Sequence, residues 1–366
     1  MTSEPRTPYY DQRELGADDE EMPRLKATRR NILLGLLFIV AVSAFLYFGL
    51  PQIADLDNTW NRLRGGDVWW LAGAFVFTMC SFGGYVALFQ GVYVRHGSRI
   101  DLKASYQITM ASLAATRLFA AGGAGGIALT AWALRRSGMS RRGVADSTVA
   151  FLALTYVVYM GALVVCGLGL RWGIFSGPAP WTLTVLPALL GLVAIGVFLL
   201  MALVPTDLER RLRDWACDQG RPRLARFGQR LASVPAATSA GVREAIAHAR
   251  SRDPALIGSL AFWGFNIAVL WACFHAFGDP PPWGVLIMGY FVGMLGNLLP
   301  LPGGVGGVDG GMIGAFTALG VPFSVALVAV LAYRGFAFWL PTIPGAIAYF
   351  QLRKTVRQWR RVAVLH

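Results

Sequence analysis

Several stretches of this chain run for twenty or more residues without a charged side chain, among them residues 31–50 and residues 182–204. A helix needs about 20 apolar residues to cross the hydrocarbon core of a bilayer. Inside lipid the backbone has no water to bond with, so it must satisfy its own hydrogen bonds, as a helix does. Each run therefore predicts a transmembrane helix.

The composition agrees with a membrane protein. The 366 residues are 55% hydrophobic and only 14% charged, whereas soluble domains carry about 25% charged residues. The net charge of +13 would suit nucleic acid, but the charges lie in short segments between apolar runs, as in cytoplasmic loops. The four cysteines show no metal or disulfide spacing. We expect an all-α polytopic membrane protein with no nucleic-acid partner, no metal and no cofactor.

The basic segments predict the topology. Residues 1–30 form a polar tail whose end, "RLKATRR", precedes the first apolar run, and residues 351–366 form a basic tail. Both tails should therefore lie on the cytoplasmic side of the cytoplasmic membrane. Two tails on the same side of the membrane require an even number of crossings between them. We assign these crossings to the transmembrane domain at 31–350. The six predicted spans are 31–50, 68–94, 144–170, 182–204, 255–277 and 323–350.

Two further apolar segments are predicted to enter the membrane and return. Residues 104–134 are too short for two crossings, which need about 40 residues, yet basic residues flank them on both sides. A re-entrant hairpin with its turn at 120–126 resolves this conflict. Residues 283–320 form a second hairpin, which enters from the outside.

The two hairpins belong to an internal repeat. The motifs "AGGAGGIA" (121–128) and "PGGVGGVD" (302–309) lie 181 residues apart. The same offset carries the predicted spans that flank the first hairpin onto those that flank the second. Repeat A covers about 68–170 and repeat B about 255–350, and the charge pattern gives them opposite orientations.

Inverted repeats with broken helices build the substrate sites of many transporters near the membrane midplane. Helix N-termini at such breaks attract anions, and glycine allows a ligand to approach the backbone. The alternative is that these glycines only allow close helix packing, as GxxxG pairs do. The candidate substrate-binding positions in the two motifs are Gly122, Gly123, Gly125, Gly126, Pro302, Gly303, Gly304, Gly306 and Gly307.

Few ionisable residues lie within apolar segments, where burying a charge is costly and such residues are usually functional. Arg117 precedes the first glycine motif, Asp309 ends the second, and Arg334 lies within the last predicted span. An arginine can hold a phosphate with two hydrogen bonds. The alternative is that Arg117 and Arg334 form structural bridges to Asp309 or to free carbonyls. Asn297 either contacts substrate or caps a half-helix.

The basic segment at 205–254, with ten arginines against six acids, is predicted to form amphipathic helices. They would lie on the anionic inner leaflet or simply connect the two halves. No set of nucleophile, base and carboxylate converges, so the sequence does not favour an enzyme.

The segments "RLFAAGGAGGIALTAWALRRSGMS" and "NLLPLPGGVGGVDGG", with the arginine one span later, resemble the lysylphosphatidylglycerol synthase transmembrane-domain family. That family is also described as flippase-like. The resemblance covers roughly 30–350. Asp309 falls where the family usually has glutamate, and Arg334 falls on the family arginine. The family's proline before the first glycines is replaced here by Ala120 and Ala121.

The resemblance implies movement of lipid between leaflets. We expect a translocase of an anionic lipid or a lipid-linked head group. Lysyl transfer is not expected, because no soluble transferase domain follows the membrane region. Two alternatives remain: a non-transporting partner of an envelope lipid or glycan enzyme, and an integral-membrane enzyme acting on polyprenyl-linked substrates. The sequence does not indicate an oligomeric state.

Overall fold

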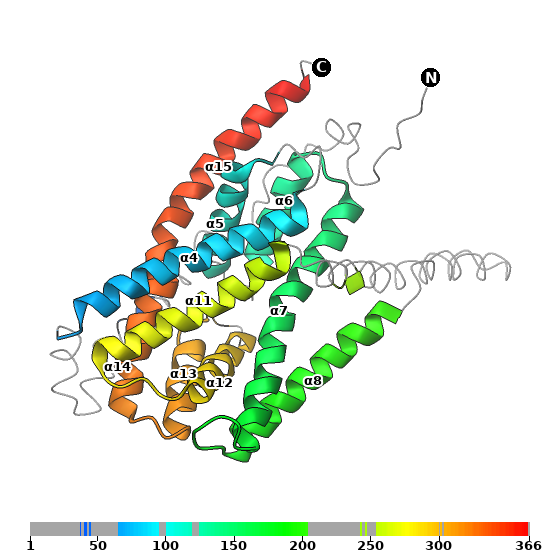
Figure 1. The fold of residues 1–366 in the computed structure, drawn as a ribbon. Coiled ribbons are helices and arrows are strands. Elements are labelled where there is room, and N and C mark those ends of the chain that lie inside the picture. Colours follow the sequence, from blue (N-terminus) through cyan, green and yellow to red (C-terminus); the bar gives the residue numbers. More distant parts are fainter. Residues whose placement is uncertain are drawn as a thin grey trace.

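The computed structural model describes residues 65–94, 100–118, 124–203, 254–299, 301 and 304–364, together with single positions in 37–44 and 242–246. The described residues are helical and contain no strand (Figure 1). The elements are α4 (Val68–Tyr93), α5 (Leu102–Leu118), α6 (Ala124–Arg136), α7 (Arg141–Arg171), α8 (Trp181–Leu203), α11 (Pro254–Phe277), α12 (Trp283–Met294), the 3-10 turn η3 (Leu295–Leu298), α13 (Gly307–Ala318), α14 (Phe323–Arg334), the π turn η5 (Gly335–Trp339) and α15 (Leu340–Val364).

Five helical segments of the described chain are long and apolar enough to cross a membrane. They correspond to five of the six predicted spans, so the chain is a multi-pass membrane protein. The last of them combines α14, η5 and α15 into one segment, Phe323–Trp359. The predicted span at 31–50 and nearly all of the basic segment at 205–254 lie outside the described residues.

Capping residues set where the spanning helices begin. The Asp67 carboxylate accepts a hydrogen bond from the Trp69 backbone N–H (2.9 Å) at the start of α4. The Ser140 hydroxyl oxygen accepts a hydrogen bond from the Gly143 backbone N–H (3.1 Å) at the start of α7. Each cap satisfies one of the free N–H groups in a first helical turn. The cap at Ser140 lets α7 begin three residues earlier than the predicted span at 144–170.

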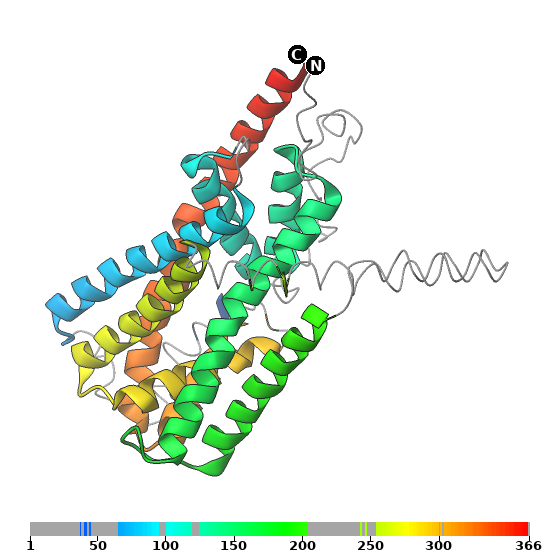
Figure 2. The ribbon, with the colours of Figure 1, turned by 45° about the vertical axis from the view of Figure 1, so that its right-hand side comes forward.

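Helices α4 and α11 lie side by side and antiparallel in both ribbon views (Figures 1 and 2). At one end the Asp67 N–H donates to the Ala276 carbonyl (3.0 Å). At the middle of the pair the Ser81 hydroxyl donates to the Phe262 carbonyl (3.0 Å). A Cβ on Gly84 or on Gly258 would collide with the backbone of the other helix. These glycines therefore allow the two helices to pack with their backbones in contact.

Two pairs of short helices lie at different ends of the molecule (Figure 1). In the first pair, α5 and α6 run antiparallel, with the Ser112 and Thr130 hydroxyls 2.7 Å apart. In the second pair, α12 with η3 runs antiparallel to α13, and Gly296 lies against the Gly307 backbone. Each of these helices has 17 residues or fewer, short of the ~20 that a crossing needs.

The structure corrects one detail of the predicted hairpins. The turn predicted at 120–126 is shorter, because α6 already begins at Ala124 and contains Gly125 and Gly126. The glycine-rich stretch after Pro302 leads into a helix. Helix α13 begins at Gly307, so Asp309 lies in its first turn.

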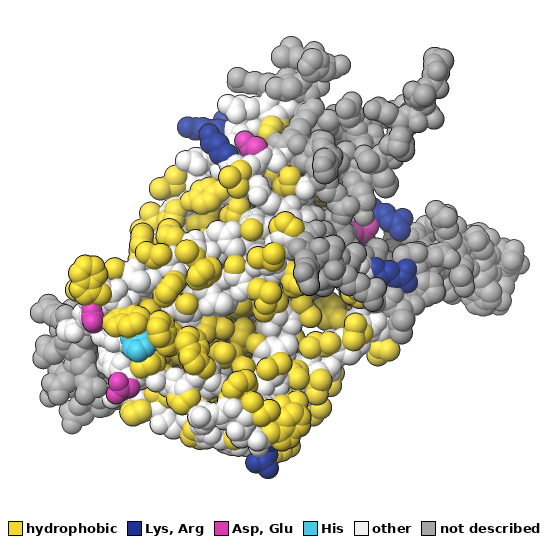
Figure 3. All heavy atoms as spheres, viewed as in Figure 1, with side chains coloured by type: hydrophobic (Ala, Val, Ile, Leu, Met, Phe, Trp, Pro, Cys, Tyr) yellow, Lys and Arg dark blue, Asp and Glu magenta, His cyan; other side chains and the backbone are white. Residues whose placement is uncertain are grey.

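The buried apolar side chains of the described residues form two large clusters. The first draws mainly on α11, α12, α13, α14 and the second half of α7. The second draws mainly on α5, α6, the second half of α4, the first half of α7 and the far part of α15. A separate small cluster contains Val305 and Phe338, with Trp339 packed against it. The described surface in Figure 3 is largely hydrophobic, with its charged side chains towards the margins.

Candidate functional site

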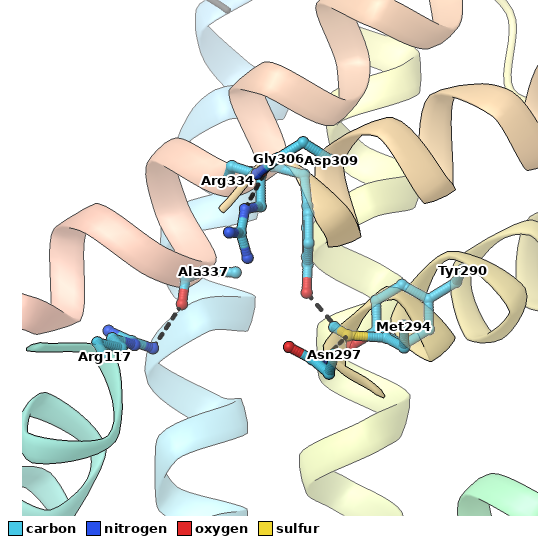
Figure 4. Close-up of polar contacts among 9 residues, drawn as sticks. Arg117, Tyr290, Met294, Asn297, Gly306, Asp309, Arg334 and Ala337 are labelled. Carbon is cyan, nitrogen blue, oxygen red and sulfur yellow. Dashed lines mark hydrogen bonds and ion pairs between the residues drawn. The ribbon is translucent and has the colours of Figure 1, made fainter. Parts of the chain in front are cut away.

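Asp309 and Arg334 form a buried ion pair. Arg334 Nε donates to Asp309 Oδ1, and Asp309 Oδ2 accepts from the Gly306 N–H at 2.7 Å (Figure 4). Asp309 is 2% and Arg334 8% exposed. The two carboxylate oxygens thus bind one arginine and one free N–H at the start of α13. Such pairing offsets the large cost of removing both charges from water.

Arg334 retains one donor group without a partner. Its Nη2 atom is buried and makes no hydrogen bond to any described residue. Leaving a buried donor unpaired is costly, and most such groups in folded proteins have a partner. An unpaired guanidinium nitrogen beside a paired one is therefore a place where an acceptor from a ligand or water would be stabilised.

Arg117 binds the backbone around the π turn. Its Nη1 donates to the Phe338 carbonyl (2.7 Å) and to the Thr342 hydroxyl (3.2 Å), and its Nη2 donates to the Ala337 carbonyl (2.8 Å; Figure 4). The Ala337 carbonyl is available because Pro341, four residues later, has no N–H to return the helical bond. A proline thus creates the acceptor that an arginine from α5 takes.

Both arginines also touch the ring of Phe338. The guanidinium carbon of Arg117 lies 5.1 Å from the ring centroid, and that of Arg334 lies 4.6 Å from it. These distances are typical of cation–π contacts. Arg117 comes from the first helix pair and Asp309 from the second, so the last span joins the two pairs at this point. With one carboxylate and two guanidinium groups among the described residues, the site carries a net positive charge.

A polar network lies next to this site. The Tyr333 hydroxyl donates to Asn266 Oδ1 (3.2 Å) and lies 3.2 Å from the Tyr290 hydroxyl. The Asn266 amide donates to the Ser81 hydroxyl (2.6 Å) and to the Phe262 carbonyl (2.9 Å). Sequence reasoning missed this network, although an asparagine in the apolar run 255–277 was a usable signal, because polar side chains in spans commonly bond neighbouring helices.

The described glycines of the second motif shape the backbone. Gly304 and Gly306 have φ values of +66° and +85°, which favour glycine because a Cβ is strained there. Gly307 packs against the Gly296 backbone, and Gly311 against that of Gly293. Close packing between helices, the alternative to ligand binding, therefore explains why residues 307 and 311 are glycines.

The other predicted positions are distributed as follows. Gly125 and Gly126 are buried in α6, where a Cβ on Gly126 would collide with Thr116 and Ser112 of α5. Asn297 is exposed in η3, and its amide donates to the Met294 sulfur (3.5 Å). Four predicted positions lie outside the described residues: Gly122, Gly123, Pro302 and Gly303.

Comparison with known proteins identifies one matching family. The family described as "Lysylphosphatidylglycerol synthase TM region" matches residues 32–345. Three similar proteins from Methanothermobacter thermautotrophicus are each named "UPF0104 membrane protein". One is 37% identical over 91 residues, which is 25% of this chain and 26% of the relative. Another is 26% identical over 201 residues, 53% and 58% of the two chains. The chain thus spans between a quarter and somewhat over half of the length of the relatives it matches.

Proposed function

Because the chain belongs to the lysylphosphatidylglycerol synthase transmembrane-region family, we propose that it is a flippase-like translocase. It moves an anionic lipid, or an anionic lipid-linked head group, between the leaflets of the cytoplasmic membrane. The observation that carries this proposal is the site where Asp309 pairs with Arg334 alone, Arg117 lies on the same Phe338 ring, and the Nη2 group of Arg334 has no partner among the described residues.

The charges of the site favour an anion. Asp309 neutralises Arg334, while Arg117 bonds only neutral groups among the described residues. A buried positive charge without a counter-ion is unfavourable, so an anionic head group would be stabilised there. Planar guanidinium groups with several donors match the oxygens of a phosphate.

We further propose that each pair of short helices is a re-entrant hairpin and that the two repeats are inverted. The contacts between α4 and α11 support this proposal. Ser81 bonds Phe262, and these positions are themselves 181 residues apart. If a twofold axis passes through this contact, a second contact should exist wherever both residues of a first are shifted by 181 positions. Gly84 and Gly258 touch through their backbones. Their counterparts, Phe265 and Phe77, are also in contact, with ring centroids 6.2 Å apart.

A second pair of contacts is related by the same offset of 181 residues. The rings of Tyr85 and Phe262 lie 4.8 Å apart. The offset relates this pair to Asn266 and Ser81, which are joined by the 2.6 Å hydrogen bond. Helices α5 and α12 also begin 181 residues apart, at Leu102 and Trp283. Such a pseudo-twofold axis in the membrane plane is typical of transporters with a midplane site.

The proposed orientation of the chain in the membrane is supported by exposed basic side chains, which lie at the end of the spans that we assign to the cytoplasm. In α15, Leu352 and Val356 pack against the apolar cluster around α5 and α6, while the opposite face is basic. An excess of lysine and arginine at one end of the spans favours the cytoplasmic side. The exposed basic residues that belong to this group are Lys103, Arg142, Arg353, Lys354 and Arg357.

A leaflet-accessibility assay in reconstituted vesicles tests the proposed function. Fluorescent anionic lipid would be placed in one leaflet, and its appearance in the other followed by quenching with an impermeant reductant. The wild type should move the lipid faster than protein-free vesicles. Arg171→Ala, an exposed arginine at the end of α7, is the matched control and should move it at the wild-type rate.

A further inference from the structure

Phe338 lies against both of the arginines that would bind a head group. Its ring contacts the guanidinium groups of both Arg117 and Arg334, and it is 5% exposed. We propose that Phe338 is a displaceable gate, whose ring is exchanged for a phosphate group that then binds both arginines at once. This inference rests on the proposed function, because it describes how the same site selects and admits its ligand.

The position of Phe338 in the core supports a sealing role. The two large apolar clusters surround one helix pair each, and Phe338 belongs to neither. It packs instead with Val305, a 3% exposed residue just before α13, and with Trp339. Among the described residues this small cluster lies where the end of α5 and the start of α13 approach the last span. Moving the Phe338 ring aside would therefore expose the guanidinium groups of Arg117 and Arg334 without disrupting either large cluster.

The unpaired donor of Arg334 indicates what would replace the ring. An aromatic face stabilises a guanidinium group electrostatically, but it cannot accept the directed hydrogen bonds that Nη2 lacks. A phosphate oxygen accepts such bonds and carries charge, which makes the interaction stronger. Phosphate is thus favoured over the ring, whereas a head group without an anionic oxygen is not.

A phosphate in the place of the ring would lie near both arginines. The guanidinium carbons of Arg117 and Arg334 lie 5.1 Å and 4.6 Å from the ring centroid, so a phosphate centred there would be close to the charged donors of both side chains. The ring also lies in η5, a π turn, and π turns often occur at functional sites. The ligand class is accordingly a phosphate monoester or diester, whether on a lipid or free.

Trp339 provides a native reporter of ring displacement. Its ring lies edge-on to that of Phe338, with centroids 5.1 Å apart. The fluorescence of Trp339 is obtained as the difference between the wild type and Trp339→Phe, both purified in detergent. Three probes are titrated: dihexanoyl phosphatidic acid, inorganic phosphate and dihexanoyl glycerol.

Phosphatidic acid should change the Trp339 signal saturably, and dihexanoyl glycerol should not. A similar change with inorganic phosphate would identify the phosphate group alone as the ligand. A response to phosphatidic acid only would identify a phosphorylated lipid, and both results support the gate. No saturable change with either phosphate probe, or an equal change with dihexanoyl glycerol, would overturn it.

Variants of Phe338 give a second, independent measurement. Removing the competing ring in Phe338→Ala should tighten phosphatidic acid binding roughly five- to thirty-fold in equilibrium dialysis. Phe338→Leu, which keeps an apolar side chain and guards against misfolding, should tighten it as well. Phe336→Leu, in the same turn but packed against the larger apolar cluster, should bind as the wild type does. Unchanged or weaker binding by folded Phe338→Leu would contradict the gate.

The binding and transport results separate the two claims. If wild-type protein binds phosphatidic acid with a Trp339 change but vesicles show no lipid movement, the translocase proposal fails and the phosphate site stands. If vesicles move lipid but the Phe338 variants bind like the wild type, the gate fails and the translocase proposal stands.

Discussion

The Nε atom of Arg334 lies 2.6 Å from the Oδ1 atom of Asp309, and this ion pair joins the last span to the first turn of α13. The contact connects a helix that crosses the membrane with one that is too short to do so. Both side chains are buried, so the pair affects stability as well as any ligand that the arginine binds.

Asp309→Ala should destabilise the protein by about 3–5 kcal/mol, because it leaves a buried charge without a partner. The double variant Asp309→Leu with Arg334→Met should recover most of this loss, because it removes both charges together. Thermal unfolding in one detergent measures both. If Asp309→Ala alone were as stable as the wild type, the ion pair would not be removed from water as proposed.

Arg117→Ala should cost about 1–3 kcal/mol, because two partly buried carbonyls lose a charged donor. The cost should shrink in a Pro341→Ala background, where a restored N–H can bond the Ala337 carbonyl instead. A double-mutant cycle on thermal stability measures this coupling. Strictly additive effects would refute the proposed link between Pro341 and Arg117.

Close packing of α4 and α11 predicts different effects for two glycines on the same helix. Gly258→Ala should destabilise the protein by about 1–3 kcal/mol, because the new Cβ meets the Leu88 backbone. Gly264→Ala has open space around it and should be neutral or slightly stabilising, since alanine favours the helix. The comparison is made by thermal unfolding. Equal effects at both positions would argue against the backbone contact.

Cysteine labelling tests the proposed orientation. A cysteine at Arg142, exposed at the start of α7, should react with an impermeant reagent only from the cytoplasmic side, and one at Gly278 only from the outside. The neighbouring Gly138 is unsuitable, because it is buried and has a φ of +101°. Native cysteines, including the exposed Cys80, are first replaced. Labelling of position 142 from outside would overturn the first re-entrant hairpin.

Four of the spanning helices were predictable within a few residues, whereas the last one continues as α15 to Val364, well past the predicted end at 350 and through most of the predicted tail. The prediction of 255–277 compares with an observed helix at Pro254–Phe277. Bilayer thickness sets the length of an apolar run, so the run itself marks the helix. The bounds of the glycine-rich segments were less predictable, because α6 and α13 begin inside the motifs and depend on packing against α5 and α12.

The partners of the buried polar groups were harder to predict. A helix that is apolar on all sides does not indicate which face meets a neighbour, so nothing in the sequence paired Asn266 with Tyr333. The acceptor of Arg117 is a carbonyl 220 residues later, and it depends on the location of a proline in another helix. For Arg334, the sequence left a bridge to Asp309 and a ligand site as alternatives, and the ion pair leaves Nη2 available for a ligand as well.

The central claim, that Arg117 and Arg334 carry an anionic lipid across the membrane, is tested most directly by the rate of lipid movement in vesicles containing Arg334→Ala. Losing a charged hydrogen-bonding partner of the lipid should lower the rate about ten-fold or more relative to the wild type. The Arg171→Ala control should keep the wild-type rate. Equal rates for Arg334→Ala and the wild type, at matched amounts of folded protein, would contradict the account.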